Sequence, residues 1–204
     1  MRGFFIVFEG ITGSGKKTHI KLLAEKLKSS GKEVTIISFP DYEDPIARLT
    51  KRTDLDAYTK SLLFTADRQS KQEKIKELLE KGSIILCDRY CYSNFAYQSA
   101  RGVPIEWLME IEKNVIKPDL VILIDLPVEL CMKRVQQANL EDFTKHEILE
   151  RLERNREFLK IISESFRALA SSNKETEWLV IDGTKSIEEN HLTIWNYVKE
   201  KLGM

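Results

Sequence analysis

The sequence predicts an α/β fold in which a five-stranded parallel sheet carries helices on both faces. Five short apolar runs alternate with segments of helical periodicity. A glycine-rich loop also separates the first apolar run from the first helical segment. Because a helical segment stands between successive strands, the connections are expected to be right-handed crossovers between parallel strands. The 204 residues are enough to bury one full core, so we expect a single domain over residues 1–204.

The first predicted strand is the run 4–8, which is aromatic and β-branched. Its lack of polar alternation indicates burial on both faces. The second run ends at Pro40 and the third follows Gly82, and both residues are typical of strand ends. The other four strands are expected at residues 34–39, 83–87, 120–126 and 178–181, and the run 34–39 is also expected to be buried.

The predicted helices carry recognisable end signals. Apolar residues recur at helical spacing from Thr18 to Ser29, and Gly31 stands where a left-handed C-cap is needed. Pro127 fits the first turn of a later helix, and residues 144–170 have helical apolar spacing. Two pairs have the spacing of capping boxes, Thr144 with Glu147 and Ser186 with Glu189.

Composition excludes several classes of partner and site. The 32 Lys and Arg residues equal the 32 Asp and Glu residues, so no dominant field for nucleic acid or a membrane surface is expected. The apolar run before Glu9 is too short for a signal peptide or a membrane span. Three cysteines without a Cys-x-x-Cys pair indicate a reducing cytoplasm and no zinc site: Cys87, Cys91 and Cys131.

The glycine-rich loop has the pattern of a phosphate-binding loop. It connects a buried strand to a helix and reads Gly10-Ile11-Thr12-Gly13-Ser14-Gly15-Lys16. Glycines let backbone N–H groups face a phosphate, the helix N-terminus adds partial positive charge, and Lys16 can bridge two phosphoryl groups. We therefore expect a nucleoside triphosphate to bind this loop and the next two residues, Lys17 and Thr18.

The residue after the loop lysine departs from the usual pattern. A Ser or Thr that ligates Mg²⁺ is expected there, and this chain has Lys17. Thr18 is one residue further on, so on a helix it points about 100° away and cannot take over that ligand position. Two alternatives stay open. Lys17 supplies positive charge in place of the metal ligand, or the metal is held by phosphates, water and a carboxylate.

A carboxylate and a guanidinium follow the third predicted strand. Asp88 and Arg89 come directly after residues 84–87, at the carboxyl edge of the sheet, where α/β folds bind ligands. Asp88 is expected to hold a metal-bound water or to orient the attacking oxygen, and Arg89 to grip an acceptor phosphate. A structural Asp–Arg ion pair is the alternative. Glu9 and Asp125 end the first and fourth strands and are further candidates.

These motifs together resemble the thymidylate kinase family of nucleoside monophosphate kinases. They occur in the family's order and extend over nearly the whole chain: Phe8-Glu9-Gly10, Phe39-Pro40, Leu62 to Arg68, Asp88-Arg89-Tyr90 with Ser93, and Asp119 to Leu126 followed by Pro127 and Arg134. The resemblance implies a P-loop NTPase-type three-layer fold and transfer of the ATP γ-phosphoryl group to dTMP with Mg²⁺, giving ADP and dTDP. It also implies a short lid at about residues 133–145 and a homodimer.

The resemblance assigns roles to side chains on the acceptor side. Phe64 would stack on the thymine ring, Arg68 would donate to a thymine carbonyl, and Asn94 would contact the base edge. Stacking of this kind stabilises a base by roughly 1–3 kcal/mol. Tyr97 would disfavour a ribose 2′-hydroxyl, with Gln98 beside it, and core packing is the alternative for both aromatic residues. Further acceptor contacts are expected from Glu9, Phe39, Pro40, Arg89 and Ser93.

The chain differs from the family pattern around the phosphates. Thr12 stands where the family usually has Asp, and Lys17 replaces the metal-binding hydroxyl. Tyr42 occupies the position of a frequent acceptor-phosphate Arg, for which Arg48 is a possible substitute. These changes fall at positions around the phosphates, and they limit how far the family's activity can be carried over to this chain.

The lid also differs from the family pattern. Gly13 is typical of members whose lid supplies a catalytic Arg, yet residues 135–143 contain neither Arg nor Lys. Arg134, Lys133 or Lys145 would then have to reach the phosphates. A well-placed arginine contributes on the order of 10³–10⁵ to the rate of phosphoryl transfer, so we expect Arg134 to belong to the catalytic set.

Two alternatives to a thymidylate kinase stay open at this point. One is a related nucleotide or deoxynucleoside kinase with a different acceptor. The other is a nucleotide-binding protein with weak or no transfer activity, which the changes at Thr12 and Lys17 motivate. In the main hypothesis Lys16 neutralises the transferring charge, Asp88 organises the metal or the acceptor, and Arg89 positions the monophosphate.

Overall fold

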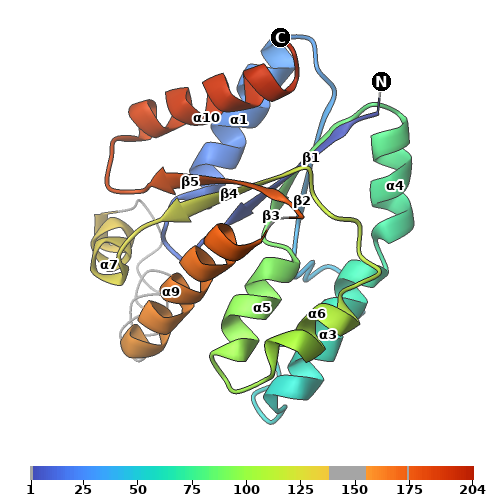
Figure 1. Cartoon of the computed structure of the whole chain (residues 1–204), viewed down its shortest axis with the longest axis vertical. Coiled ribbons are helices and arrows are strands. Elements are labelled where there is room, and N and C mark those ends of the chain that lie inside the picture. The colour runs from blue at the N-terminus through green and yellow to red at the C-terminus, as the bar shows by residue number, and fades with distance from the viewer. Residues whose placement is uncertain (1, 138–154, 174) are drawn as a thin grey trace.

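The computed structural model describes residues 2–137, 155–173 and 175–204. Within these ranges, five parallel strands form one sheet in the order β2-β3-β1-β4-β5 (Figure 1). The strands are β1 (Phe4–Glu9), β2 (Val34–Ser38), β3 (Ile84–Asp88), β4 (Leu120–Asp125) and β5 (Glu177–Asp182). The α/β class and the parallel sheet are therefore confirmed, and each strand lies where the sequence predicts it.

Helices cover both faces of this sheet (Figure 1). On one face α1 (Lys16–Ser29) packs beside α10 (Ile187–Lys201), and on the other α5 (Cys91–Ser99) packs beside α9 (Arg156–Ser172). The remaining described helices are α2 (Pro45–Leu49), α3 (Ala57–Gln69), α4 (Gln72–Glu80), α6 (Ile105–Ile111) and α7 (Val128–Gln137). The arrangement has the three layers that the sequence predicts.

The sheet separates two apolar cores, and β1 contributes to both. Phe5 and Val7 pack into the core that includes residues of α4, α5, α7 and α9. Ile6 and Phe8 pack into the core formed with α1 and α10. All four side chains are fully buried, which explains why this run shows no polar alternation.

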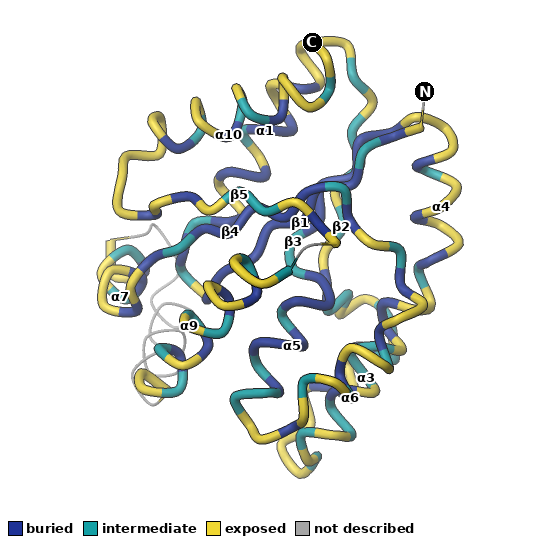
Figure 2. Tube along the Cα trace, viewed as in Figure 1, coloured by how far each residue is buried: buried dark blue, intermediate teal, exposed yellow. Residues whose placement is uncertain are grey.

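The second predicted strand is more exposed than expected. β2 pairs with β3 and lies at the edge of the sheet. The side chain of Ile36 is 51% exposed, and β2 is largely intermediate or exposed in Figure 2. The expectation of burial for this segment is wrong, because an apolar run alone does not reveal which strand lacks a neighbour.

Helix-end signals agree with the structure where it describes them. Ser186 Oγ accepts from the N–H of Glu189 at 3.1 Å, and the Glu189 carboxylate accepts from the N–H of Ser186 at 3.1 Å. Gly31 has a φ of 76° just after α1, as its predicted capping role requires. The pair Thr144 and Glu147 and residues 138–145 of the expected lid lie outside the described residues. No described helix combines the length and the apolarity that crossing a membrane requires.

Candidate active site

The carboxyl ends of β1, β3 and β4 meet at one edge of the sheet. β1 lies between β3 and β4, and Phe8 of β1 is in register with Asp88 of β3. The glycine-rich loop leaves β1 at this edge, so it lies next to Asp88 and Arg89. Ligands of parallel α/β sheets bind at such an edge.

Three glycines shape the backbone of the loop. Gly10, Gly13 and Gly15 have φ angles of 139°, 85° and 105°, which other residues rarely adopt. A Cβ atom on Gly10 would lie 2.7 Å from the carbonyl oxygen of Ile124, and one on Gly13 would lie 3.2 Å from the Cβ of Cys131. Because α1 begins directly after Gly15, its free N–H groups and its dipole are available to an anion held by the loop.

The ammonium group of Lys16 is folded back onto the loop. Its Nζ donates hydrogen bonds of 3.0 Å to the carbonyl oxygens of Gly10 and Ile11. Burial lowers the pKa of Lys16 to about 7, helped by the charge of Arg89 and opposed by that of Asp88. A phosphate is a stronger partner for an ammonium group than two carbonyls are, so a bound triphosphate would draw Lys16 away and restore its full charge.

One carboxylate oxygen at this edge is free to hold a metal or its water. Asp88 Oδ1 is buried and has no hydrogen-bond partner, which is unusual for a buried oxygen. Lys17 and Thr18 are exposed on α1. The described residues contain no group of three or more His, Cys, Asp or Glu that could hold a metal ion. These observations fit Mg²⁺ bound through Asp88, phosphate oxygens and water, which is a common arrangement for this ion.

Arg89 links the phosphate loop to α5. Its φ of 70° is the one positive value at a non-glycine residue in the described ranges, and such conformations cluster at functional sites. Nη1 donates to Ser93 Oγ at 3.0 Å, and Nη2 donates to Thr12 Oγ1 at 3.4 Å. The guanidinium also lies over the ring of Tyr97, 5.5 Å from its centroid. The structure thus brings together four residues that the sequence predicted separately.

Glu9 is the buried last residue of β1, and its carboxylate bonds to the start of α5. Its carboxylate is fully buried and accepts hydrogen bonds from Tyr90 N at 2.8 Å, Ser93 N at 3.0 Å and Ser93 Oγ at 2.7 Å. These donors belong to the start of α5, so Glu9 caps that helix from a neighbouring strand. Burial raises the pKa of Glu9, although Arg89 and Ser93 oppose this effect. These contacts give Glu9 a role in positioning Ser93, and its substrate contact stays a prediction.

The residues predicted to contact the base gather around α3 and α5. Phe64 is partly exposed on α3, whereas Arg68, Asn94 and Gln98 are 2%, 3% and 2% exposed. Tyr97 packs against the core from α5. The ring of Tyr97 therefore has the core packing that was the alternative to its ligand role, and it also contacts Arg89. Asn94 Oδ1 and Gln98 Oε1 are both buried without a hydrogen-bond partner. Unpartnered acceptors of this kind need an explanation, and a ligand that donates hydrogen bonds would supply one.

Glu112 belongs to the same cluster and was not predicted. It follows α6, and its carboxylate accepts hydrogen bonds from Arg68 Nε and Nη2, from Asn94 Nδ2 and from Thr65 Oγ1. Burial alone would lower the pKa of Arg68, but the charge and hydrogen bonds of Glu112 raise it. The sequence carries a signal for this residue, because Glu112 is four residues after Leu108 and so falls on the same side of a helical pattern as this apolar residue.

Of the two arginines expected to supplement the site, Arg134 reaches the phosphate loop. Arg134 Nη1 donates to the carbonyl oxygen of Ser14 at 3.3 Å, and Nη2 donates to that of Gly183 at 2.5 Å. Arg48 instead donates to carbonyl oxygens of its own loop, including that of Tyr42 at 2.8 Å. The structure therefore joins Arg134 to the predicted site and gives Arg48 a local role.

Asp125 is the remaining strand-end carboxylate. It forms two hydrogen bonds with Arg167 of α9, at 2.8 Å and 3.0 Å. This ion pair connects β4 to a covering helix, so the structure gives Asp125 a packing role. The predicted functional role of Asp125 has no support from these contacts.

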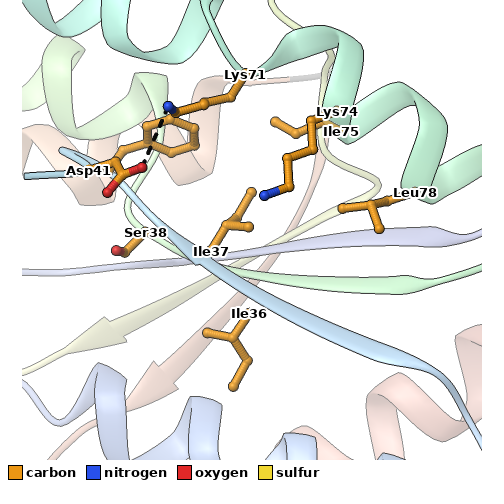
Figure 3. A pocket seen from close by; sticks show the side chains of 9 residues that line it. Ile36, Ile37, Ser38, Asp41, Lys71, Lys74, Ile75 and Leu78 are labelled. Atoms are coloured by element: carbon orange, nitrogen blue, oxygen red, sulfur yellow. Dashed lines mark ion pairs between the residues drawn. The ribbon is translucent and has the colours of Figure 1, made fainter. Parts of the chain in front are cut away.

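A separate hollow of about 350 Å³ lies between β2 and α4 (Figure 3). Its lining residues include Phe39 and Asp41, and Asp41 pairs with Lys71 at 3.6 Å. The side chain of Lys74 extends from α4 toward Ile37 (Figure 3). The lining residues include none from the glycine loop or the cluster around Glu112, and Phe39 is the one predicted site residue among them.

Comparison with known proteins agrees with this geometry. The family model described as thymidylate kinase matches residues 8–194. A probable thymidylate kinase of Pyrococcus abyssi is 38% identical, with 99% of this chain and 98% of the relative covered. A probable thymidylate kinase of Methanocaldococcus jannaschii is 39% identical, with 96% and 95% covered. The thymidylate kinase of Plasmodium falciparum is 36% identical, with 93% and 87% covered. The chain therefore belongs to the thymidylate kinase family, as its motifs indicated.

Proposed function

We propose that this protein is an ATP-dependent thymidylate kinase, which converts ATP and dTMP to ADP and dTDP. Family membership and the names of the relatives support a phosphotransferase that acts on dTMP. They do not favour a different acceptor or a binding protein without transfer. The structural observation that carries the proposal is the chain of contacts from Thr12 through Arg89 to Ser93. It connects the phosphate loop with the helix that bears Asn94.

The transfer step joins an oxygen of the dTMP phosphate to the γ-phosphorus of ATP. The bond between that phosphorus and the oxygen bridging to the β-phosphate breaks, and the oxygen leaves with ADP. The loop from Gly10 to Thr18 holds the donor phosphates, Lys16 moves onto their oxygens, and Arg89 holds the acceptor phosphate. Catalysis by such a site is mainly positioning and stabilisation of charge.

Asp88 is the proposed ligand of Mg²⁺ or of its bound water. Its buried and unpartnered Oδ1 supports this role. When bound, Mg²⁺ supplies charge neutralisation for the donor phosphates. Asp88 itself orients the acceptor oxygen. It is the last residue of β3 and directly precedes Arg89, which holds the acceptor phosphate.

Arg134 is proposed to add positive charge beside the transferring group. Its contact with the carbonyl of Ser14 supports this role, since it places a guanidinium against the loop. We further propose a short lid at about residues 133–145, which begins within α7, in one domain that spans residues 1–204. Arg134 then replaces the arginine that residues 135–143 lack.

The acceptor nucleoside is proposed to lie between α3 and α5. The partly exposed ring of Phe64 stacks on the thymine, Arg68 and Asn94 contact its edge, and Tyr97 lies under the sugar with Gln98 beside it. Ser93 supports the acceptor phosphate through Arg89. Phe39 and Pro40 close the side of the site that faces β2.

We also propose that the protein is a homodimer. Tyr58 and Leu62 of α3 and Met109 of α6 are apolar and 47%, 49% and 48% exposed. α3 and α6 pack together, with the rings of Tyr58 and Trp107 5.1 Å apart. A second copy of the chain would cover this patch. Leu62→Glu is expected to give a monomer in sedimentation velocity, and an unchanged sedimentation coefficient would contradict this assignment.

A reducing, cytoplasmic setting is part of the proposal. Cys87, Cys91 and Cys131 are all free and buried. Burial raises the pKa of each of these thiols, which keeps them unreactive. Free thiols without disulfides are typical of reducing compartments.

The test of the proposed function is a coupled assay of ADP release. Acceptors should include dTMP, dUMP, UMP, CMP and thymidine, each with and without Mg²⁺. We expect dTMP to be preferred and activity to require the metal. Preference for another acceptor would refute the substrate assignment. Binding of ATP and dTMP in calorimetry, without dTDP formation at any Mg²⁺ concentration, would favour a binding protein.

A further inference from the structure

Four hydrogen bonds converge on the carboxylate of Glu112. The donors are Thr65 Oγ1 at 2.8 Å, Arg68 Nε at 3.0 Å, Arg68 Nη2, and Asn94 Nδ2 at 2.9 Å. The side chains of Glu112 and Arg68 are 1% and 3% exposed. An ionised carboxylate accepts hydrogen bonds and cannot donate them. Each group that faces Glu112 must therefore turn a donor toward it.

This requirement fixes the orientation of the Asn94 amide. An amide has one end that donates and one end that accepts. Because Nδ2 is committed to Glu112, Oδ1 is the end left for a ligand, and Oδ1 is buried with no partner. A buried acceptor without a partner destabilises the empty site and favours a ligand that donates to it.

The same carboxylate divides the donors of Arg68. Glu112 uses Nε and Nη2, whereas Nη1 makes no hydrogen bond to the described part of the chain. Arg68 Nη2 and Asn94 Nδ2 bond the same oxygen, Glu112 Oε1, so the two side chains are neighbours. The groups left for a ligand are an N–H donor from Arg68 and an oxygen acceptor from Asn94.

We propose that Glu112 is the positioning residue that sets the hydrogen-bond polarity of the base site. A donor beside an acceptor is complementary to an imide edge, in which a carbonyl oxygen stands beside a ring N–H, as in thymine and uracil. The corresponding edge of cytosine has the opposite order, an amino group beside an unprotonated ring nitrogen. This inference rests on the proposed function, because it assumes that the acceptor base binds at this cluster.

Replacing the carboxylate by an amide removes the constraint. In Glu112→Gln the side chain keeps its length and can offer Nε2 to Asn94. The Asn94 amide is then free to rotate, accept from Gln at position 112, and turn Nδ2 toward the ligand. That orientation suits the ring nitrogen of cytosine and opposes the N–H of thymine.

The test compares dTMP and dCMP as acceptors in the full-length protein. For Glu112→Gln we expect kcat/KM for dTMP to fall about 10- to 100-fold, mainly through KM, because a buried hydrogen bond is lost. We expect the preference for dTMP over dCMP to fall by at least about tenfold. The double variant Glu112→Gln with Asn94→Asp exchanges carboxylate and amide, so an acceptor again faces the base. It should recover most of the preference.

Thr176→Val is the matched control. It removes the buried hydrogen bond of 2.9 Å from Tyr92, which lies on the same helix as Asn94, without touching the Glu112 cluster. We expect a lower Tm and an unchanged ratio of dTMP to dCMP. If Glu112 affected the preference only through the stability of the fold, the destabilised Thr176→Val variant would lose the same preference.

Several results would overturn the inference. These are an unchanged preference in folded Glu112→Gln, an equal loss of preference in Thr176→Val, or no recovery in the double variant. If Glu112→Gln does not fold, Glu112→Asp decides: it still only accepts, so preference should persist while KM rises, and lost preference would contradict us. Wild-type protein that does not prefer dTMP would instead refute the proposed function, and this result requires no variant.

Discussion

Ser93 Oγ donates to Glu9 Oε2 at 2.7 Å, and this bond decides what Ser93 offers to Arg89. A hydroxyl has one proton, and here it is used on Glu9. The lone pairs of Oγ therefore accept from Arg89 Nη1 at 3.0 Å. The buried carboxylate thus holds the orientation of Arg89 through one intervening side chain.

Glu9→Gln should therefore weaken the acceptor side. The amide keeps the shape but loses the charge opposite Arg89 and cannot accept from every donor that Glu9 serves. We expect the free energy of unfolding to fall by about 1–3 kcal/mol and kcat/KM for dTMP to fall roughly tenfold or more. Ser93→Ala keeps the charge of Glu9, so we expect smaller decreases in both the free energy of unfolding and kcat/KM. Chemical denaturation and steady-state kinetics measure both effects, and wild-type values for Glu9→Gln would contradict this account.

Lys16 should make ATP binding depend on pH. In the free protein its pKa is lowered to about 7, so above that pH the amine is mostly neutral. Triphosphate oxygens favour the ammonium form and raise the pKa. Binding therefore takes up a proton above pH 7, and affinity should decrease as pH rises from there.

Calorimetry in two buffers of different ionisation enthalpy measures this uptake. Lys16→Arg is the control, because its guanidinium stays charged throughout and should take up no proton. Equal heats in both buffers at pH 8 for the wild type would show that Lys16 is already charged.

Lys17→Ser should keep or improve turnover that depends on Mg²⁺. Lys17 is exposed, so its replacement should leave Tm nearly unchanged, and a hydroxyl there supplies the usual ligand. The Mg²⁺ concentration at half-maximal rate should fall relative to Lys17→Ala, which removes the charge without adding a ligand. Complete loss of activity in Lys17→Ser would instead show that the lysine is essential.

Asp88→Asn should separate catalysis from ATP binding. The change removes the charge but keeps the shape around the unpartnered Oδ1. We expect kcat to fall by about 10²–10³, as for other groups that stabilise charge in a transition state. ATP affinity measured by calorimetry without Mg²⁺ should stay within a few-fold of wild type. A kcat near wild type would remove Asp88 from the proposed mechanism.

Local sequence patterns were sufficient for the sheet and for the phosphate loop. Buried strands such as β1 appear as apolar runs because both faces are covered, and the loop appears as glycines between a strand and a helix. Asp88 and Arg89 could be placed because parallel strands bring their carboxyl ends to one edge.

Roles that depend on partners distant in the chain could not be predicted in this way. Glu112 is 44 residues from Arg68, and Glu9 is 84 residues from Ser93. Neither separation follows from periodicity or from a turn. The exposure of β2 has the same origin, since it depends on which strands become neighbours.

Because Cys131 lies close to Gly13, the reactivity of its thiol reports transient local opening of the structure around the phosphate loop. The thiol is fully buried beneath the loop, and burial raises its pKa to about 12. An alkylating reagent can attack it only after the surrounding elements separate. The rate at which Cys131 is labelled would therefore measure how often the structure around the loop opens. A bound triphosphate that holds the loop in place should lower that rate.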